Sequence, residues 1–123
     1  MLPKLIFGES YKDGRGDLNY NNSFNLYPIK RFYTIVNKDI SFKRGWQGHK
    51  TEQRWFTAVS GKFKIQIILI DNWSNPSVDL KKITFELVDD TLDVLHIPPG
   101  YISSIQSLTS NSKLLIMSDY ELN

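Results

Sequence analysis

Apolar and polar residues alternate with the two-residue period of β-strands along several short segments of this chain. From 62 to 70 the sequence KFKIQIILI places Phe63, Ile65 and Ile67 on one face and lysine or glutamine on the other, before it becomes wholly apolar. This pattern predicts a half-buried strand that enters a hydrophobic core. Similar runs, rich in β-branched and aromatic residues, predict further strands at 31–36, 80–88, 92–97, 101–108 and 113–118.

Turn-forming residues separate the predicted strands. Asp13, Gly14 and Gly16 mark a tight turn within residues 1–28, which we expect to form a hairpin arm. Ser60-Gly61 is a hairpin signal, and Pro98-Pro99-Gly100 forces a sharp exit from the strand before it. We find no helical period over ten or more residues and no internal repeat. About eight to ten short strands predict a single all-β domain over residues 1–123, a sandwich or barrel.

Composition and charge narrow the functional classes. The chain has no cysteine, which excludes cysteine catalysis and thiolate metal sites. Its formal charge is +2, and basic residues are scattered among acidic ones, so a nucleic-acid partner is not expected. No apolar run approaches the roughly 18 residues of a membrane span, and the N-terminus lacks the apolar core of a signal peptide. These features predict a soluble cytoplasmic protein without a membrane partner.

The short stretch 44–54 is rich in charged and polar side chains. Its members lie within eleven residues: Arg44, Gln47, His49, Lys50, Glu52 and Arg54. Because a strongly apolar strand follows, we expect the cluster to lie on a strand or strand end that a sheet holds rigid, as in a binding or catalytic site. Arg54 and Trp55 are expected to continue this strand. Regular alternation would place Gln47, His49 and Thr51 on one face and Lys50 on the other.

Three residues carry the candidate chemistry, and each has a structural alternative. The imidazole of His49 titrates near neutral pH and can move a proton, although a lone strand histidine is often simply packed. The guanidinium of Arg44 matches phosphate oxygens in a bidentate way, or it is a surface arginine. Tyr33 is either a hydrogen-bonding partner in the same cavity or a strand tyrosine whose hydroxyl is in water.

The order of several short motifs resembles the RmlC-like cupins. Within them it is most similar to the WxcM-like sugar-nucleotide enzymes, the dTDP-4-keto-6-deoxyhexose 3,4-ketoisomerases, with the dTDP-4-dehydrorhamnose 3,5-epimerases as more distant relatives. The matching segments are Asp13 to Gly16, Ile29 to Ile35, Arg44 to Lys50, Ser60-Gly61, Ile97 to Gly100 and Ser118 to Tyr120. The resemblance implies a small antiparallel cupin-type β-barrel, or jelly roll, with a pocket in its mouth. It also implies an isomerase or epimerase that acts on a nucleotide-linked 4-keto-6-deoxy sugar, with dTDP the expected nucleotide, by proton transfer through an enediol.

The resemblance also suggests roles for individual residues. His49 would move the proton, and Tyr33 would donate to or hold the oxygen. Arg44 and Arg15 would bind the diphosphate, with Arg15 reaching it from an arm that pairs with the partner's sheet in a homodimer. The remaining substrate-binding candidates are Gln47, for a sugar hydroxyl or carbonyl, and Lys50. His96, before the Pro-Pro-Gly turn, is expected to be packed or exposed rather than to line the pocket.

Two positions depart from the family pattern, because Gln47 and Ser103 stand where relatives have histidine. Glutamine cannot accept and return a proton near neutral pH. The ligand positions of metal-binding cupins read Gln47, His49, Arg54 and Ser103, a set with one imidazole and an added positive charge. We therefore predict no metal and no other cofactor, and a dioxygenase-type cupin is disfavoured. The alternative to an enzyme is a non-catalytic cupin that binds a sugar nucleotide or carbohydrate in polysaccharide biosynthesis.

Overall fold

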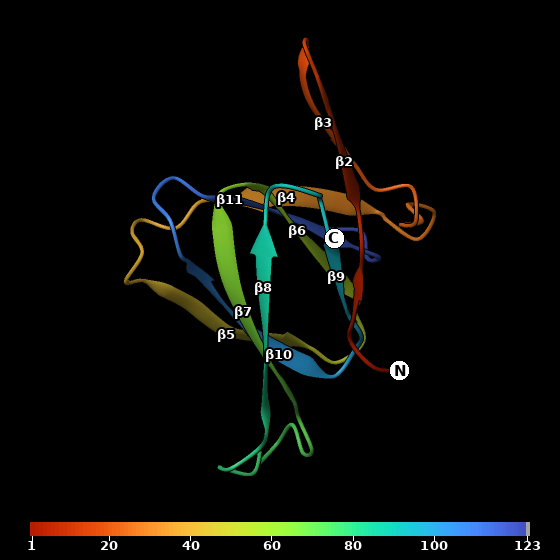
Figure 1. Cartoon of the computed structure of the whole chain (residues 1–123). Helices are drawn as coiled ribbons and strands as arrows, with labels where there is room; N and C mark the ends of the chain where they lie inside the picture. The colour runs from red at the N-terminus through yellow and green to blue at the C-terminus, as the bar shows by residue number, and fades with distance from the viewer. Residues whose placement is uncertain (123) are drawn as a thin grey trace.

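The structure is a computed structural model that describes residues 1–122, and within that range it consists of strands, turns and loops without a helix (Figure 1). No helix in these residues could therefore cross a membrane. The strands are β1 (Lys4–Ile6), β2 (Glu9–Asp13), β3 (Gly16–Tyr20), β4 (Arg31–Ile35), β5 (Lys43–His49), β6 (Arg54–Ser60), β7 (Lys62–Leu69), β8 (Lys82–Val88), β9 (Val94–Ile97), β10 (Tyr101–Ser107) and β11 (Lys113–Ser118).

Two antiparallel sheets make up the body of the protein. The five-stranded sheet has the order β1-β9-β6-β11-β4, and the four-stranded sheet has the order β5-β10-β7-β8. The hairpin β2-β3 projects away from both of them (Figure 1). Because neighbours in each sheet are mostly distant in sequence, the two layers interlock as in a jelly roll.

The hydrophobic core lies between the facing sheets. On β7 the side chains of Phe63, Ile65 and Ile67 are fully buried, whereas the intervening lysines and glutamine are not. This result confirms the strand that alternation predicted at 62–70. The same core contains Phe56 and Leu114 from the five-stranded sheet, so it joins both layers.

A second, smaller apolar cluster covers the outer face of the five-stranded sheet. Trp55, Val94 and Met117 are buried there, and Phe24 from the segment between β3 and β4 packs on Trp55 with ring centroids 6.3 Å apart. His96 stacks on the other side of this cluster, 5.0 Å from the Trp55 ring. His96 is therefore packed on the outer face and does not line the space between the sheets.

Two boundary predictions are wrong. Arg54 and Trp55 do not continue the strand of His49, because β5 ends at His49 and β6 belongs to the facing sheet. The carbonyl of His49 accepts a hydrogen bond from Gly100 N at 2.8 Å, after which the chain bends across to the other layer. The hairpin arm is also shorter than residues 1–28, because β1 pairs with β9 in the five-stranded sheet.

Candidate functional site

An irregularity in β5 determines which side chains face the interior. Gln47 pairs with Ser103 and Arg44 with Ile105, so three residues of β5 span two of β10. The extra residue is a β-bulge, and it lets side chains three positions apart lie on the same face. Gly45 occupies this bend, where an added Cβ would lie 2.8 Å from the carbonyl oxygen of Ser103. A glycine is therefore required there by the close approach of β10.

The bulge places Arg44, Gln47 and His49 on the inner side of the four-stranded sheet. Cross-strand partners share a face. His49 pairs with Tyr101 and Arg44 with Ile105, and both partners belong to the core between the sheets. The sequence prediction that Gln47 and His49 share a face is correct, but regular alternation would have excluded Arg44 from it.

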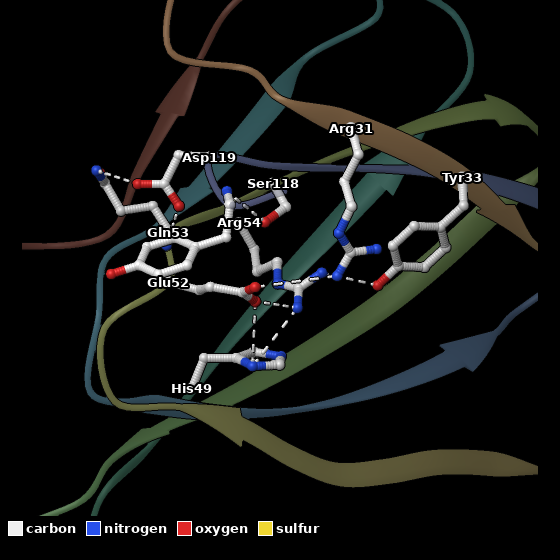
Figure 2. Close-up of polar contacts among 9 residues, drawn as sticks. Arg31, Tyr33, His49, Glu52, Gln53, Arg54, Ser118 and Asp119 are labelled. Atoms are coloured by element: carbon white, nitrogen blue, oxygen red, sulfur yellow. Dashed lines mark hydrogen bonds and ion pairs between the residues drawn. The ribbon is translucent and has the colours of Figure 1, made fainter. Parts of the chain in front are cut away.

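His49 lies beside the ion pair of Glu52 and Arg54 (Figure 2). Its Nδ1 is 3.3 Å from Oε2 of Glu52 and 3.5 Å from Nη2 of Arg54. The same Glu52 oxygen accepts a hydrogen bond from Arg54 Nη2. Arg54 is buried, whereas 39% of the His49 side-chain surface remains exposed. The imidazole therefore contacts buried charges on one edge and is open on the other.

Arg54 connects His49 to Tyr33 on the facing sheet. Its Nη1 donates a hydrogen bond of 2.9 Å to the hydroxyl oxygen of Tyr33 on β4. Arg31 lies against the same tyrosine, with its guanidinium carbon 5.3 Å from the ring centroid, and its Nη2 is 3.9 Å from Glu52 Oε1. Figure 2 shows these side chains converging from β4, β5 and the start of β6.

Burial and neighbouring charges set the protonation of His49. Burial lowers the pKa of His49, and the positive charge of Arg54 lowers it further. The carboxylate of Glu52 opposes this shift, while Arg31 adds to it. A histidine whose pKa lies below its ordinary value of about 6.5 is neutral at pH 7. The ring can therefore accept a proton at neutral pH, as a general base must.

The other predicted residues lie at three different places. Gln47 is exposed on the inner strand face, opposite Ser103, and Lys50 is exposed in the bend just after β5. Arg44 lies further along β5, where its Nε donates a hydrogen bond of 3.3 Å to Oδ1 of Asn37. Asn37 is itself buried and donates from Nδ2 to the carbonyl of Ile105 at 3.1 Å.

Arg15 is not brought to His49 within this chain. It lies at the tip of the β2-β3 hairpin, which points away from the barrel (Figure 1). Its side chain is 88% exposed and forms an ion pair of 2.7 Å with Asp13. Both residues belong to the same turn, so the arm presents Arg15 to its surroundings.

Sequence reasoning missed the roles of Arg31, Glu52 and Arg54 in this site. It treated Arg54 as an obstacle to a metal and Glu52 only as a charged neighbour. One available signal was the arginine that opens RWFTA, because β6 is otherwise buried at its start and a charge there needs a partner. Residues 1–122 contain no group of three histidine, aspartate or glutamate side chains that could hold a metal ion.

Comparison with protein-family models relates this geometry to a known group. The FdtA family model, described as WxcM-like, C-terminal, matches residues 3–123. The chain belongs to this family. A search of curated proteins by sequence found no significant match.

Solved structures show the same fold. A His-to-Asn mutant of the 3,4-ketoisomerase QdtA from Thermoanaerobacterium thermosaccharolyticum, in complex with TDP-4-keto-6-deoxyglucose, is 23% identical, with a TM-score of 0.76 over 100% of this chain and 85% of that one. A 3,4-ketoisomerase from Helicobacter canadensis is 24% identical, with a TM-score of 0.72 over 100% and 86%. A dTDP-4-dehydrorhamnose 3,5-epimerase from Bacillus anthracis is 15% identical, with a TM-score of 0.74 over 98% and 74%. The predicted all-β, cupin-type fold is confirmed.

Proposed function

We propose that this protein is an isomerase or epimerase of a nucleotide-linked 4-keto-6-deoxy sugar. The observation that carries the proposal is the bridge formed by Arg54, which contacts Nδ1 of His49 at 3.5 Å and the hydroxyl of Tyr33 at 2.9 Å. One buried guanidinium thus lies between a neutral base and a proton donor. Membership in the WxcM-like family supports the same reaction class.

The proposed reaction is a proton transfer next to a ketone. Nδ1 of His49 contacts Glu52 and Arg54, which leaves Nε2 for the substrate. Nε2 removes the proton from the carbon beside the carbonyl, and the hydroxyl of Tyr33 donates to the carbonyl oxygen, which gives an enediol. Return of a proton to the former carbonyl carbon, with loss of the neighbouring hydroxyl proton, completes a ketoisomerisation. Return of a proton to the original carbon from the opposite face, with the enol proton passing back to Tyr33, is an epimerisation, and neither route needs an oxidant.

Arg44 is proposed to bind the diphosphate of the substrate. Only its Nε is directed to Asn37, so the two Nη groups can donate to phosphate oxygens as a planar fork. Gln47 on the same strand face is proposed to bind a sugar hydroxyl or carbonyl, and Lys50 at the end of β5 to add positive charge at the opening. Arg15 would complete the anion site from a second subunit, because its hairpin projects from the barrel. This arrangement requires a homodimer.

Binding can be tested separately from turnover. Thymidine diphosphate is expected to raise the melting temperature of the protein, and Arg44→Ala should abolish that shift. Lys43→Ala removes an exposed positive charge from the neighbouring position and should keep the shift. Loss of the shift in both variants would point to general electrostatics rather than to Arg44, and no shift with any nucleotide would contradict nucleotide-sugar binding.

The second candidate is a non-catalytic cupin that binds a sugar nucleotide or carbohydrate. The observation that favours it is Gln47 opposite Ser103 on the inner strand face, since neither side chain can transfer a proton near neutral pH. Arg54, beside His49, also brings positive charge to the place where a metal-dependent cupin holds its cation. The site then retains anion-binding groups with a single imidazole.

The deciding experiment incubates the protein with dTDP-4-keto-6-deoxyglucose in deuterated buffer and follows the sugar protons by NMR. We expect exchange of the proton beside the carbonyl, or signals of a new keto sugar. Tight binding without exchange or conversion would support the non-catalytic cupin instead.

A further inference from the structure

We infer that Glu52 and Arg54 form a positioning pair that directs the protons of His49 and Tyr33. Glu52 keeps the imidazole proton on Nδ1, so that Nε2 is the basic nitrogen. Arg54 donates a hydrogen bond to the hydroxyl oxygen of Tyr33, so that the phenolic proton points to the substrate. The catalytic meaning of this pair rests on the proposed function, whereas the position of the imidazole proton is a property of the free protein.

The contact between His49 and Glu52 favours a proton on Nδ1. Oε2 of Glu52 is 3.3 Å from Nδ1, and the Glu52 side chain is only 16% exposed. An ionised carboxylate can only accept hydrogen bonds, so a hydrogen bond between these two groups requires the proton on Nδ1. In a neutral imidazole the other nitrogen, Nε2, then carries the free lone pair.

Arg54 competes for the same ring nitrogen. Its Nη2 is 3.5 Å from Nδ1, and a guanidinium can only donate. If Arg54 were the partner of His49, Nδ1 would be the acceptor and the proton would move to Nε2, which would block the base. Glu52 opposes this outcome, because its Oε2 lies closer to Nδ1 than Nη2 does.

The same donor rule fixes the orientation of the Tyr33 hydroxyl. Arg54 Nη1 donates to the phenolic oxygen at 2.9 Å, so the tyrosine proton cannot point back toward Arg54. Arg31 lies over the ring and restricts its position. Tyr33 is thereby prepared to donate to an oxygen that becomes negatively charged during the reaction.

Stability alone does not explain this buried pair. Removing two charges from water is costly, and a buried ion pair is often no more stabilising than apolar residues of similar volume. In addition, Nε of Arg54 is buried without a hydrogen-bond partner among the described residues. Stability is therefore not a sufficient reason for this pair, and its place between His49 and Tyr33 fits a role in directing their protons.

The test reads the imidazole tautomer by ¹⁵N NMR at a pH where His49 is neutral, without substrate. The chain has two histidines, so His49→Asn assigns both sets of signals. In the native protein we expect the proton of His49 on Nδ1. In Glu52→Ala we expect it on Nε2, because Arg54 becomes the only charged partner of Nδ1. In Glu52→Gln, whose amide oxygen can still accept, the proton should remain on Nδ1.

Controls separate the pair from general effects of charge and folding. Glu86→Gln removes an exposed carboxylate that pairs with Lys62 on β7, and it should leave the tautomer of His49 unchanged. If Glu52→Ala fails to fold, Glu52→Ala combined with Arg54→Met removes the buried charge as well, and this protein should also lose the Nδ1 proton. A proton on Nε2 in the native protein, or one that stays on Nδ1 without Glu52, overturns the inference.

Turnover then distinguishes this inference from the proposed function. With active native enzyme, Glu52→Ala should lower kcat roughly 100-fold, with a smaller change in KM, since the base is lost but the binding groups remain. An inactive native protein with the expected tautomers would contradict the isomerase while the positioning of His49 stands. If the enzyme is active but the tautomer of His49 is the same with and without Glu52, only the role of the positioning pair is contradicted.

Discussion

The two histidines of this chain have similar burial but very different surroundings. Burial is the main cause that lowers the pKa of both His49 and His96, and each ring is half-buried. His96 lies on the outer face of the five-stranded sheet, stacked on Trp55, with Nε2 2.6 Å from Oε1 of Gln53. His49 lies between the sheets, beside an ion pair and connected to a tyrosine. A lowered pKa by itself therefore does not distinguish a packed histidine from a candidate base.

The partners of the two rings explain the difference. Gln53 is held in place by Asp119, which accepts from its backbone N at 2.8 Å and from its Nε2 at 3.1 Å. His96 is thus the end of a hydrogen-bond network that runs through Gln53 to Asp119 and anchors the start of β6. His49 instead lies directly against two charged side chains, Glu52 and Arg54, and its ring is partly open. Four predictions test whether His49 serves a function while His96 serves packing.

The largest effect is expected from replacing each ring by asparagine. His49→Asn should lower the rate of sugar proton exchange roughly 1,000-fold, because general base catalysis contributes that order of magnitude. His96→Asn should leave the rate close to that of the native protein. Proton NMR of the keto sugar in deuterated buffer measures both. Equal losses in the two variants would mean that the contrast reflects stability, which thermal melts of the same samples would show.

Tyr33→Phe should have the next largest effect. Loss of the hydroxyl removes the proposed donor to the carbonyl oxygen and should lower kcat roughly 100-fold with little change in substrate affinity. Tyr27→Phe is the matched control, since Tyr27 is almost fully exposed in the segment that precedes β4. Native kcat in Tyr33→Phe would exclude the hydroxyl from the reaction.

Substitution of His96 should destabilise the fold more than substitution of His49, which is the reverse of the order expected for activity. His96→Ala loses the contact with Trp55 and a hydrogen bond, and should lower the free energy of unfolding by about 1–2 kcal/mol. His49→Ala should cost less, because among the described residues its ring has no aromatic stacking partner. Urea unfolding measures both values. A larger loss for His49 would indicate that its ring supports the fold.

The smallest effect is the pH dependence of stability. Both histidines have a lower pKa in the folded protein, so the unfolded chain binds protons first as the pH falls through about 6.5. Their contribution is complete above that pH and is lost as the pH falls toward the folded-state values. Melting temperatures between pH 8 and pH 5 should therefore decrease on acidification. Each histidine-to-asparagine variant should reduce this slope, and an unchanged slope in both would contradict the shifts.

Much of the fold follows from alternation along the chain. Phe63, Ile65 and Ile67 identify one face of a strand, and the same period locates the segments that became β4, β8, β9, β10 and β11. His49 and Tyr33 were also identifiable, because their side chains carry suitable chemistry within motifs that resemble a known family. The alternation of apolar residues is a local property, so a reading of the sequence alone is sufficient to find it.

Which residues meet at the site depends on contacts between distant segments, and the alternation of apolar and polar residues does not predict these contacts. The bulge at Gly45 turns Arg44 to the same face as His49, and the close approach of β10 leaves no room for a side chain at Gly45. The bend after His49 carries Glu52 and Arg54 to the facing sheet, where Arg54 meets Tyr33 from a strand 21 residues earlier. By itself the sequence determined most of the strands and the core, and it indicated His49 and Tyr33 as candidates. Only tertiary structure decided which charges face His49, because this depends on the register and packing of strands that are distant in sequence.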